Sequence, residues 1–443
     1  MSDAARKPND LAAYWLPFTP NRDFKAHPRL LVSARGMYYR DDAGREVLDA
    51  MSGIWCVNAG HGRASIAEAI AKQAAELDYA PSFQFSHPKA FELAARLAAM
   101  APQGLGHVFF VNSGSEAAET ALKIARGYFH AKGETNRFRL VGRERAYHGV
   151  NFGGLSVGGI EPNRAPYTPL LPGTEDRLPV PYDAKRHAFT KGEIADGLEF
   201  AGALNEIVAR RGAESIAAVI VEPMTGSGGV YRAPNGYLRR LRDICDTHGI
   251  LLIFDEVITA FGRLGHAFAA DRYGVVPDMI CFAKGVANGA VPLGGVIVSK
   301  KIYDAFGAGP DHAISLFHGY TYTGHPLAMA AGLATLDLYR DEDLFARGAK
   351  LEPLFSDAVH ALKGAPFVKD IRAVGLAAAI ELESAPDASG KRGYEAMVRL
   401  FEDEAIVLRL SGDTLVLAPA LVATQSEIAR MTEAIGAVLK RMA

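Results

Sequence analysis

A series of short, unbroken apolar runs is the feature that most constrains the fold of this 443-residue chain. Two of the runs end in opposite charges: residues 250–254 are followed by Asp255, and residues 279–283 are followed by Lys284. Apolar runs without alternation are typical of parallel strands buried on both faces, and ligands bind beyond the carboxyl ends of such strands. We therefore expect Asp255 and Lys284 to meet at one rim of a sheet, although charges at strand ends more commonly face solvent.

The two charges indicate a chemistry as well as a position. A lysine in a crevice that holds little water can lose its proton and add to a carbonyl carbon. An aspartate beside it can keep the nitrogen of a pyridine ring protonated, which makes the ring an electron acceptor. Lys284 and Asp255 together are the least that an enzyme needs in order to use pyridoxal phosphate.

Composition narrows the class of ligand. The chain is long enough for two or three domains, 49% of its residues are hydrophobic, and its formal net charge is −2. Acidic and basic residues are interspersed, so we expect neither nucleic acid nor a membrane as partner. The three cysteines form no Cys-x-x-Cys pair, which indicates neither a disulfide framework nor a metal site. Residues 1–8 have no signal-peptide core, so we expect an untargeted, cytoplasmic protein that binds small molecules.

From about residue 62 to residue 323, helical periods alternate with apolar strands. The strands that we predict are residues 107–111, 139–142, 217–221, 250–254, 279–282 and 295–298. This alternation is typical of an α/β fold with a mostly parallel sheet sandwiched by helices. Residues 160–189, which are rich in proline, are interpreted as an ordered excursion over the sheet rather than a linker.

The two ends of the chain follow other patterns. Residues 35–49 predict two short strands around an Asp/Gly turn, and residues 327–338 predict a helix that leads into further helices with strands near 375–382 and 414–417. We interpret the chain as three parts: an amino-terminal arm with part of a small domain (1–60), a large cofactor-binding domain (61–325) and a smaller α+β domain (326–443).

A short polar motif, Asn112-Ser113-Gly114-Ser115-Glu116, follows the first predicted strand of the sheet and opens a helix. Ser113 and Glu116 satisfy the pattern of a capping box. Free N–H groups and the positive dipole end at a helix amino terminus favour a phosphate group, although any capped helix has a similar sequence. The chain has neither a Gly-x-x-x-x-Gly-Lys-Ser/Thr loop nor a Gly-x-Gly-x-x-Gly fingerprint. We therefore do not expect the phosphate group to belong to a nucleotide.

Two more strand ends carry candidate residues. Tyr147 and His148 lie in Ala-Tyr-His-Gly at residues 146–149, where an aromatic ring can lie flat over a planar cofactor, although ordinary loop packing would also explain it. Glu222 ends the run at residues 217–221 and adds another titratable group. Several strand ends therefore converge on one predicted crevice.

These motifs, in this order, resemble the class III aminotransferases, a fold type I family that uses pyridoxal phosphate, over nearly the whole chain. The most specific part is Leu-Ile-Phe-Asp-Glu-Val-Ile-Thr-Ala-Phe-Gly-Arg at residues 252–263, followed by Pro277-Asp278 and Ala283-Lys284-Gly285. The resemblance implies that Lys284 binds the cofactor covalently and shuttles the proton, and that Asp255 pairs with the ring nitrogen. The other cofactor-binding residues that we expect are Gly114, Ser115, Tyr147, His148, Glu222, Val257 and Thr321. Thr321 would reach across from the neighbouring subunit of a homodimer, which could pair further into a homotetramer.

Within the family, residues 15–25 and 54–62 are similar to β-alanine–pyruvate aminotransferases of the ω-transaminase group. Many relatives that act on ornithine or γ-aminobutyrate have a Glu/Arg carboxylate switch. This chain has Thr225-Gly226-Ser227 in place of their Gln-Gly-Glu, and Val416-Leu417-Ala418-Pro419 where they have an arginine just before Ala-Pro. Arg409 resembles the mobile arginine that binds a carboxylate and swings away for an uncharged group, and Trp55 is expected to shape the substrate side. The implied reaction transfers the amino group of β-alanine to the 2-oxo acid pyruvate in a ping-pong cycle. Amine–pyruvate transaminases share the scaffold and stay an alternative.

Single features of the sequence also fit other classes of protein. Gly-Leu-Ser-Val-Gly at residues 154–158 matches the nucleophile elbow of serine hydrolases, but residues 159–163 cannot start a helix cleanly. A non-catalytic protein that binds pyridoxal phosphate is a second alternative. A racemase, an aminomutase or a decarboxylase on the same scaffold stays open, because the sequence does not fix which bond stands perpendicular to the ring.

Overall fold

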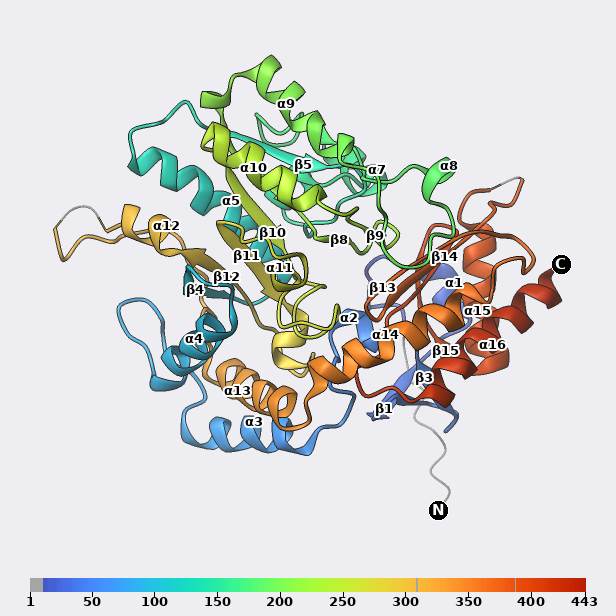
Figure 1. The fold of residues 1–443 in the computed structure, drawn as a ribbon. Coiled ribbons are helices and arrows are strands. Elements are labelled where there is room, and N and C mark those ends of the chain that lie inside the picture. The colour runs from blue at the N-terminus through green and yellow to red at the C-terminus, as the bar shows by residue number, and fades with distance from the viewer. Residues whose placement is uncertain (1–10, 308–309, 387) are drawn as a thin grey trace.

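The computed structural model describes residues 11–307, 310–386 and 388–443, and its largest feature is a sheet of seven strands in the order β4-β12-β11-β10-β7-β5-β6 (Figure 1). The strands are β4 (Leu105–Val111), β5 (Arg139–Arg143), β6 (Arg177–Leu178), β7 (Ile216–Val221), β10 (Leu251–Asp255), β11 (Met279–Ala283) and β12 (Gly294–Ser299). Neighbouring strands are parallel except where β12 pairs with β11 and β4. The prediction of a mostly parallel sheet is confirmed.

Both faces of this sheet are buried, which is why its strands read as unbroken apolar runs. In β10, Leu251 and Ile253 join the apolar cluster under α5 (Gly114–Ala131), whereas Leu252 and Phe254 join the larger core on the opposite face. That larger core also contains side chains of α9 (Glu199–Arg211), α10 (Tyr237–His248) and α13 (Pro326–Asp341). Burial of a side chain of this size contributes about 1.5–3 kcal/mol, so the two layers fix the sheet firmly.

A second sheet of four strands is antiparallel and lies toward the carboxyl end of the chain (Figure 1). Its order is β13 (Val368–Val374), β14 (Ala377–Leu382), β17 (Thr414–Leu417) and β16 (Arg409–Ser411). The accompanying helices are α14 (Leu344–His360), α15 (Lys391–Glu404) and α16 (Gln425–Met442). The order leaves β16 at an edge, paired on one side only.

A third sheet joins the two ends of the chain. Its strands are β1 (Leu31–Arg35), β2 (Tyr38–Asp41), β3 (Glu46–Asp49) and β15 (Ile406–Val407), and β15 pairs in parallel with β3. Other elements are α1 (Asn21–Ala26), α2 (Ser52–Trp55), α3 (Ala64–Glu76), α4 (Pro88–Met100), α6 (Phe152–Val157), α7 (Glu161–Arg164), α8 (Ala184–His187), α11 (Ala269–Tyr273), α12 (Lys300–Ala305), β8 (Met224–Thr225) and β9 (Tyr231–Arg232), with 3-10 turns at Ala165–Tyr167, Ala213–Ser215 and Lys284–Ala287.

Several details differ from the sequence prediction. The strands β1 and β13 were not predicted, and nothing in the alternation of elements reveals that β12 runs against its neighbours. Residues 160–189 are an ordered excursion, as predicted, and contain α7, β6 and α8. The domain boundaries stay a prediction, and residues 1–8 lie outside the described part of the chain.

Within the described ranges, no helix is both long and apolar enough to cross a membrane. The same ranges contain no cluster of three or more His, Cys, Asp or Glu side chains that could hold a metal ion.

A buried acid, Glu256, anchors the chain directly after the end of β10. Its carboxylate accepts hydrogen bonds from Thr259 Oγ1 at 3.0 Å and from the backbone N–H groups of Ala269 and of Ala270, the latter at 2.9 Å, at the start of α11. Burial raises the pKa of Glu256 to about 7, against the three donors that favour its charged form. The folded state therefore holds a proton on Glu256 at pH values where the unfolded chain has lost it.

We predict that Glu256→Gln flattens the pH dependence of stability between about pH 5 and pH 7. Because the pKa of the folded protein is raised, the contribution of Glu256 to stability is lost as pH rises through that window, by roughly 3 kcal/mol for a shift of this size. The variant has no such group to titrate, although it loses absolute stability because one amide nitrogen faces an N–H donor. Thermal unfolding at a series of pH values measures this, and parallel curves for both proteins would contradict it.

Candidate active site

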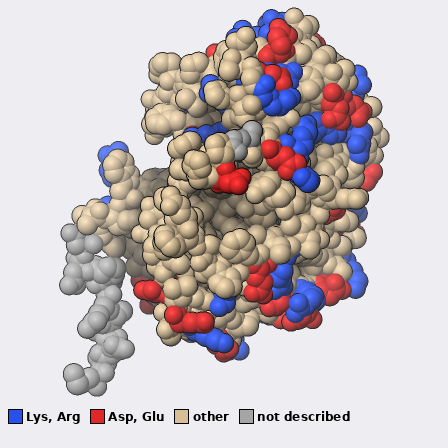
Figure 2. All heavy atoms as spheres, turned by 90° about the vertical axis from the view of Figure 1, so that its left-hand side faces the viewer, with Lys and Arg blue, Asp and Glu red and all other residues tan. Residues whose placement is uncertain are grey.

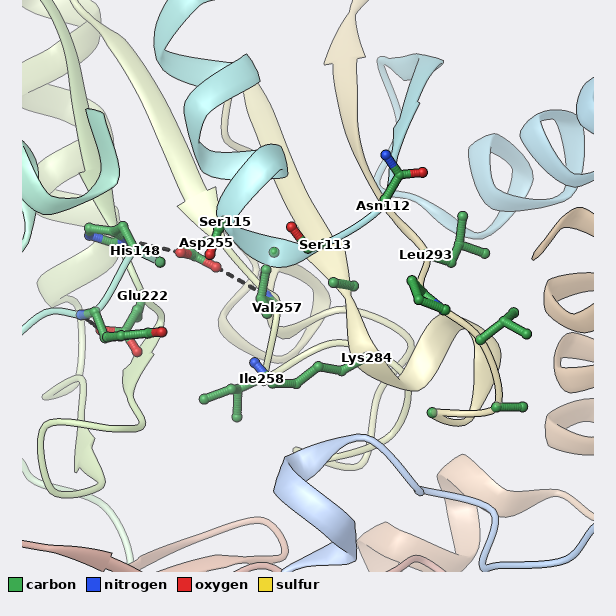
Figure 3. A pocket seen from close by; sticks show the side chains of 18 residues that line it. Asn112, Ser113, Ser115, His148, Glu222, Asp255, Val257, Ile258, Lys284 and Leu293 are labelled. Atoms are coloured by element: carbon green, nitrogen blue, oxygen red, sulfur yellow. Dashed lines mark hydrogen bonds and ion pairs between the residues drawn. The ribbon is translucent and has the colours of Figure 1, made fainter. Parts of the chain in front are cut away.

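A cavity of about 380 Å³ lies at the rim formed by the carboxyl ends of the parallel strands of the large sheet (Figure 3). Asp255 ends β10, Lys284 follows β11, and Glu222 follows β7, so the predicted meeting of these three residues occurs. The lining residues are Asn112, Ser113, Gly114, Ser115, Tyr147, His148, Gly149, Glu222, Asp255, Val257, Ile258, Ala283, Lys284, Gly289, Ala290, Val291, Pro292 and Leu293.

Asp255 is 5% exposed and is held by two donors. One oxygen lies 2.8 Å from Nδ1 of His148, and the other accepts a hydrogen bond from the backbone N–H of Val257 at 3.1 Å. His148 is buried as well, and its Nε2 has no hydrogen-bond partner among the described residues. With Nδ1 protonated, His148 fixes the carboxylate in one orientation and stabilises its negative charge.

Lys284 extends its side chain into the cavity toward the segment that carries Val257 and Ile258 (Figure 3). Its backbone has φ +53°, in the left-handed region that a residue with a Cβ rarely adopts. The turn is held by Tyr339, whose buried hydroxyl donates to the carbonyl of Gly285 at 2.6 Å. Burial lowers the pKa of Lys284, against the opposing charge of Asp255, and so favours the neutral amine that can act as nucleophile and base.

Glu222 is 3% exposed and organises two loops of the rim. Its two oxygens accept hydrogen bonds from the backbone N–H groups of Tyr147 at 3.0 Å and Gly226 at 2.9 Å. Arg143 lies below and donates to the carbonyl of Glu222 at 2.7 Å and to Thr225 Oγ1 at 2.6 Å. Burial raises the pKa of Glu222. The position of the Tyr147 ring therefore depends on an acid that bonds the backbone of its loop.

The amino terminus of α5 opens into the cavity. Ser113 Oγ accepts from the backbone N–H of Glu116 at 3.2 Å, but the Glu116 carboxylate accepts from Asn112 N at 2.8 Å and not from Ser113. The predicted capping box is therefore only half present, because Glu116 reaches one residue further back. A Cβ at Gly114 would lie 2.8 Å from a methyl group of Val257, so glycine is required where this helix end meets Val257.

Three predicted residues do not line this cavity in a single chain. Trp55 is 1% exposed and packs in an apolar cluster with Ile258, which does line it. Arg409 begins β16, and its Nε is buried without a hydrogen-bond partner among the described residues. Thr321 is exposed, and its carbonyl accepts from the hydroxyl of Tyr79 at 2.9 Å.

Sequence reasoning missed one wall of the cavity and one buried support. Residues 289–293 form a wall between the Lys284 turn and the start of β12, and their Gly and Pro content directly after Lys284 was an available signal. Arg143 follows the predicted strand at residues 139–142, so the strand-end rule that found Asp255, Glu222 and Lys284 would have found it too.

The serine-hydrolase alternative has no structural basis. Ser156 lies inside α6, not at a turn between a strand and a helix. Its hydroxyl is buried, donates to the carbonyl of Phe152 at 2.6 Å and accepts from Leu171 N at 3.2 Å. A serine in this setting is a structural residue.

The cavity suits pyridoxal phosphate. Asp255 is available to the ring nitrogen, the glycine-bearing end of α5 is available to the phosphate, and Lys284 is available to the aldehyde. Residues 20–439 match the family model described as Aminotransferase class-III, and the chain belongs to this family of transaminases, which use pyridoxal 5'-phosphate. The resemblance drawn from the sequence is confirmed.

Individual relatives agree with this assignment. The chain is 56% identical to an omega-aminotransferase of Caulobacter vibrioides (97% of this chain, 98% of the relative) and 47% identical to a beta-alanine–pyruvate aminotransferase of Pseudomonas aeruginosa (98% and 97%). It is also similar to the structure of an (S)-enantioselective omega-transaminase from Thermomicrobium roseum, with a TM-score of 0.90, 36% identity and coverage of 97% and 96%. An amine transaminase from an uncultivated Pseudomonas species, in its PLP-bound form, has a TM-score of 0.89, 36% identity and coverage of 98% and 100%.

We predict that Gly114→Ala weakens the binding of pyridoxal phosphate by about tenfold or more, because the added methyl group must displace Val257 or the helix end. Gly106→Ala is the matched control, since a Cβ at Gly106 meets nothing within 4 Å. Titration of each apoprotein with the cofactor, followed by absorbance, gives the two dissociation constants. Equal constants for both variants would show that the space at Gly114 plays no part.

Proposed function

We propose that this transaminase moves the amino group of β-alanine, or a similar ω-amino acid, to pyruvate, giving malonate semialdehyde and L-alanine in a ping-pong cycle. The names of the Caulobacter and Pseudomonas relatives support this class of donor. The structural observation that carries the proposal is the buried Nε of Arg409, which has no hydrogen-bond partner in the described part of the chain.

Arg409 lies in a setting that favours an anionic ligand. Its Nε is buried and lacks a partner among the described residues, and burial lowers the pKa of this arginine. No acid occupies the nearby segment Thr225-Gly226-Ser227, where Thr225 bonds Arg143 instead. A substrate carboxylate would supply the missing charge through two parallel hydrogen bonds. We assign to Arg409 the binding of the carboxylate of pyruvate and of β-alanine.

The other roles follow from the geometry of the rim. Pyridoxal phosphate, when bound, supplies an aldehyde that takes the amino group and a ring that accepts electrons. In the proposed mechanism Lys284 would remove a proton from the substrate carbon that bears nitrogen and would return that proton to the cofactor. Asp255, oriented by His148, would keep the ring nitrogen of the bound cofactor protonated.

The remaining residues position the cofactor and the substrate. Val257 and Tyr147 are assigned to opposite faces of the ring, and Glu222 holds the loop of Tyr147. Gly114 and Ser115, at the start of α5, are assigned to the phosphate group. Trp55 is assigned to the substrate side, where it belongs to the same apolar cluster as Ile258.

We also propose that the active unit is a homodimer in which Thr321 serves the neighbouring site. Phe85 and Phe317 are 70% and 86% exposed, and Tyr79, Phe83 and Tyr322 are exposed nearby, with the rings of Tyr79 and Tyr322 in edge contact at 6.3 Å. Figure 2 shows the side of the molecule on which α4 and α12 lie, with a hollow left of the centre bordered mainly by tan surface, and most charged side chains toward the top, right and lower margins. Exposed aromatic side chains in such number mark an interaction surface.

A second candidate donor is a simple chiral amine. The structural relatives named as an (S)-enantioselective omega-transaminase and an amine transaminase favour it. The apolar cluster of Trp55 and Ile258 next to the cavity would suit an uncharged substituent.

The spectrum of the purified holoenzyme tests the reaction. We expect the visible absorption band of the bound cofactor to bleach on addition of β-alanine alone and to return on addition of pyruvate, because the two half-reactions are separable in a ping-pong cycle. Lys284→Ala is the control and should not complete the exchange. Bleaching by an amine such as 1-phenylethylamine but not by β-alanine would transfer the assignment to the second candidate.

We predict that Phe85→Glu raises the dissociation constant of the homodimer by about a hundredfold, because a charge replaces an aromatic side chain at the centre of the proposed interface. Leu198→Glu, at an exposed position before α9, should leave the constant unchanged. Analytical ultracentrifugation of both variants measures this. A monomeric wild-type protein would disprove the proposal outright.

A further inference from the structure

We propose that Ser411 is a positioning residue that latches the strand of Arg409 to the large sheet and thereby sets the affinity for the carboxylate of the acceptor. The inference rests on the proposed role of Arg409 and names a residue to which no function has been assigned. Ser411 lies outside the cavity and two residues beyond Arg409 on the same strand.

The strand that carries Arg409 is weakly held by its own sheet. β16 contains only Arg409, Leu410 and Ser411, and it pairs with β17 alone, at the edge of the four-stranded sheet. An edge strand of three residues has few ladder hydrogen bonds and frays easily. The position of the Arg409 side chain therefore depends on what else fixes this strand.

Two side chains supply further attachments. Ser411 Oγ donates to the carbonyl of Ser227 at 2.9 Å, and Ser227 is only 5% exposed. Asp413, in the turn after β16, accepts from the backbone N–H groups of Gly390 at 2.7 Å and Gly393 at 2.9 Å around the start of α15. The Asp413 contacts stay within the carboxy-terminal part of the chain, whereas the Ser411 bond crosses to the rim of the large sheet.

The loop that receives this bond is part of the active-site rim. Gly226, adjacent to Ser227, donates its N–H to the Glu222 carboxylate, and the same carboxylate holds the backbone of Tyr147. A continuous series of hydrogen bonds thus runs from the strand of Arg409 to the loop of Tyr147. Nε of Arg409 has no partner among the described residues, and the Ser411 bond ties its strand directly to this rim. At the opposite edge of the same sheet, Arg372 Nε donates to the carbonyl of Gly229 at 2.8 Å and ties β13 to the same loop.

This arrangement means that Ser411 affects the binding of the acceptor carboxylate and not the proton transfer. Loss of the bond lets β16 move away from the rim, and the guanidinium of Arg409 then spends less time where a carboxylate can bind. Lys284, which moves the proton, follows β11, and Asp255, which pairs with the ring nitrogen, ends β10, so both keep their geometry. A variant at Ser411 should therefore change KM for pyruvate and leave kcat nearly unchanged.

The test compares Ser411→Ala with Arg409→Ala and the double variant in the holoenzyme, with pyruvate as acceptor. We expect Ser411→Ala to raise KM for pyruvate about three- to tenfold, the worth of one hydrogen bond, with kcat within about twofold. The dissociation constant of propanoate, a carboxylate that cannot react, should rise by the same factor in titration calorimetry. In the Arg409→Ala background, removal of the Ser411 hydroxyl should have no further effect.

Three further variants serve as controls. Ser411→Thr keeps the hydroxyl group and should restore the wild-type KM. Ser215→Ala removes a hydroxyl–carbonyl bond of the same kind at the opposite end of β7 and should change nothing. Ser411→Cys keeps the shape of the side chain and replaces the hydroxyl with a weaker hydrogen-bond donor. This variant replaces Ser411→Ala in the test if the alanine variant does not fold.

The outcomes separate the inference from the proposed function. If Arg409→Ala raises KM for pyruvate but Ser411→Ala does not, the positioning role of Ser411 is wrong and the role of Arg409 stands. An equal effect of Ser411→Ala with and without Arg409 would show that Ser411 does not act through this arginine. If Arg409→Ala leaves KM for pyruvate unchanged, both the assigned role of Arg409 and the latch are overturned.

Discussion

Burial of the large sheet on both faces is the constraint on which the rest of the structure depends. Leu251 and Ile253 face one apolar layer and Leu252 and Phe254 face the other, so a polar side chain has no place along β10. Charged groups can enter only where the strands end. Because the parallel strands end at the same rim, the acids and the lysine that the chemistry requires are brought together by packing alone.

Acidic and basic side chains at the rim differ in how they are paired. The buried acids Glu222, Asp255 and Glu256 are satisfied mainly by backbone N–H groups, a hydroxyl and a histidine, and none of them forms an ion pair with Lys or Arg in the described part of the chain. Lys284 and Arg409 are therefore not consumed by neighbouring carboxylates. A site of this kind leaves the amine of Lys284 free to react and the guanidinium of Arg409 free to bind an anionic substrate, while each buried acid keeps its hydrogen-bond donors.

The sequence was sufficient for the features that follow from burial and from strand ends. The sheet, the meeting of Asp255 with Lys284 and Glu222, and the helix end at Gly114 all depend on local patterns. The direction of β12 and the presence of β13 depend on pairing between distant segments, which periodicity does not encode. The capping pattern failed for a smaller reason, since Glu116 could reach either Ser113 or Asn112 and only the three-dimensional path of the loop decides between them. Residues 289–293 were missed because they belong to no strand or helix.

The reversed direction of β12 has a consequence for how the substrate range of such a protein can change. Because β12 is antiparallel to β11, it begins at the rim where β11 ends, so residues 289–293 stay at the rim and line the cavity without belonging to a strand. Ala290 and Pro292 in this segment are exposed within one chain, whereas Gly289 has φ +68° and a Cβ there would lie 3.0 Å from Cys56 Sγ. Changes there alter the wall of the cavity without shifting the register of β11 or β12. The fold thus separates a segment open to diversification from the strands that hold the reacting groups, and new specificities can arise in the first while the second stays fixed.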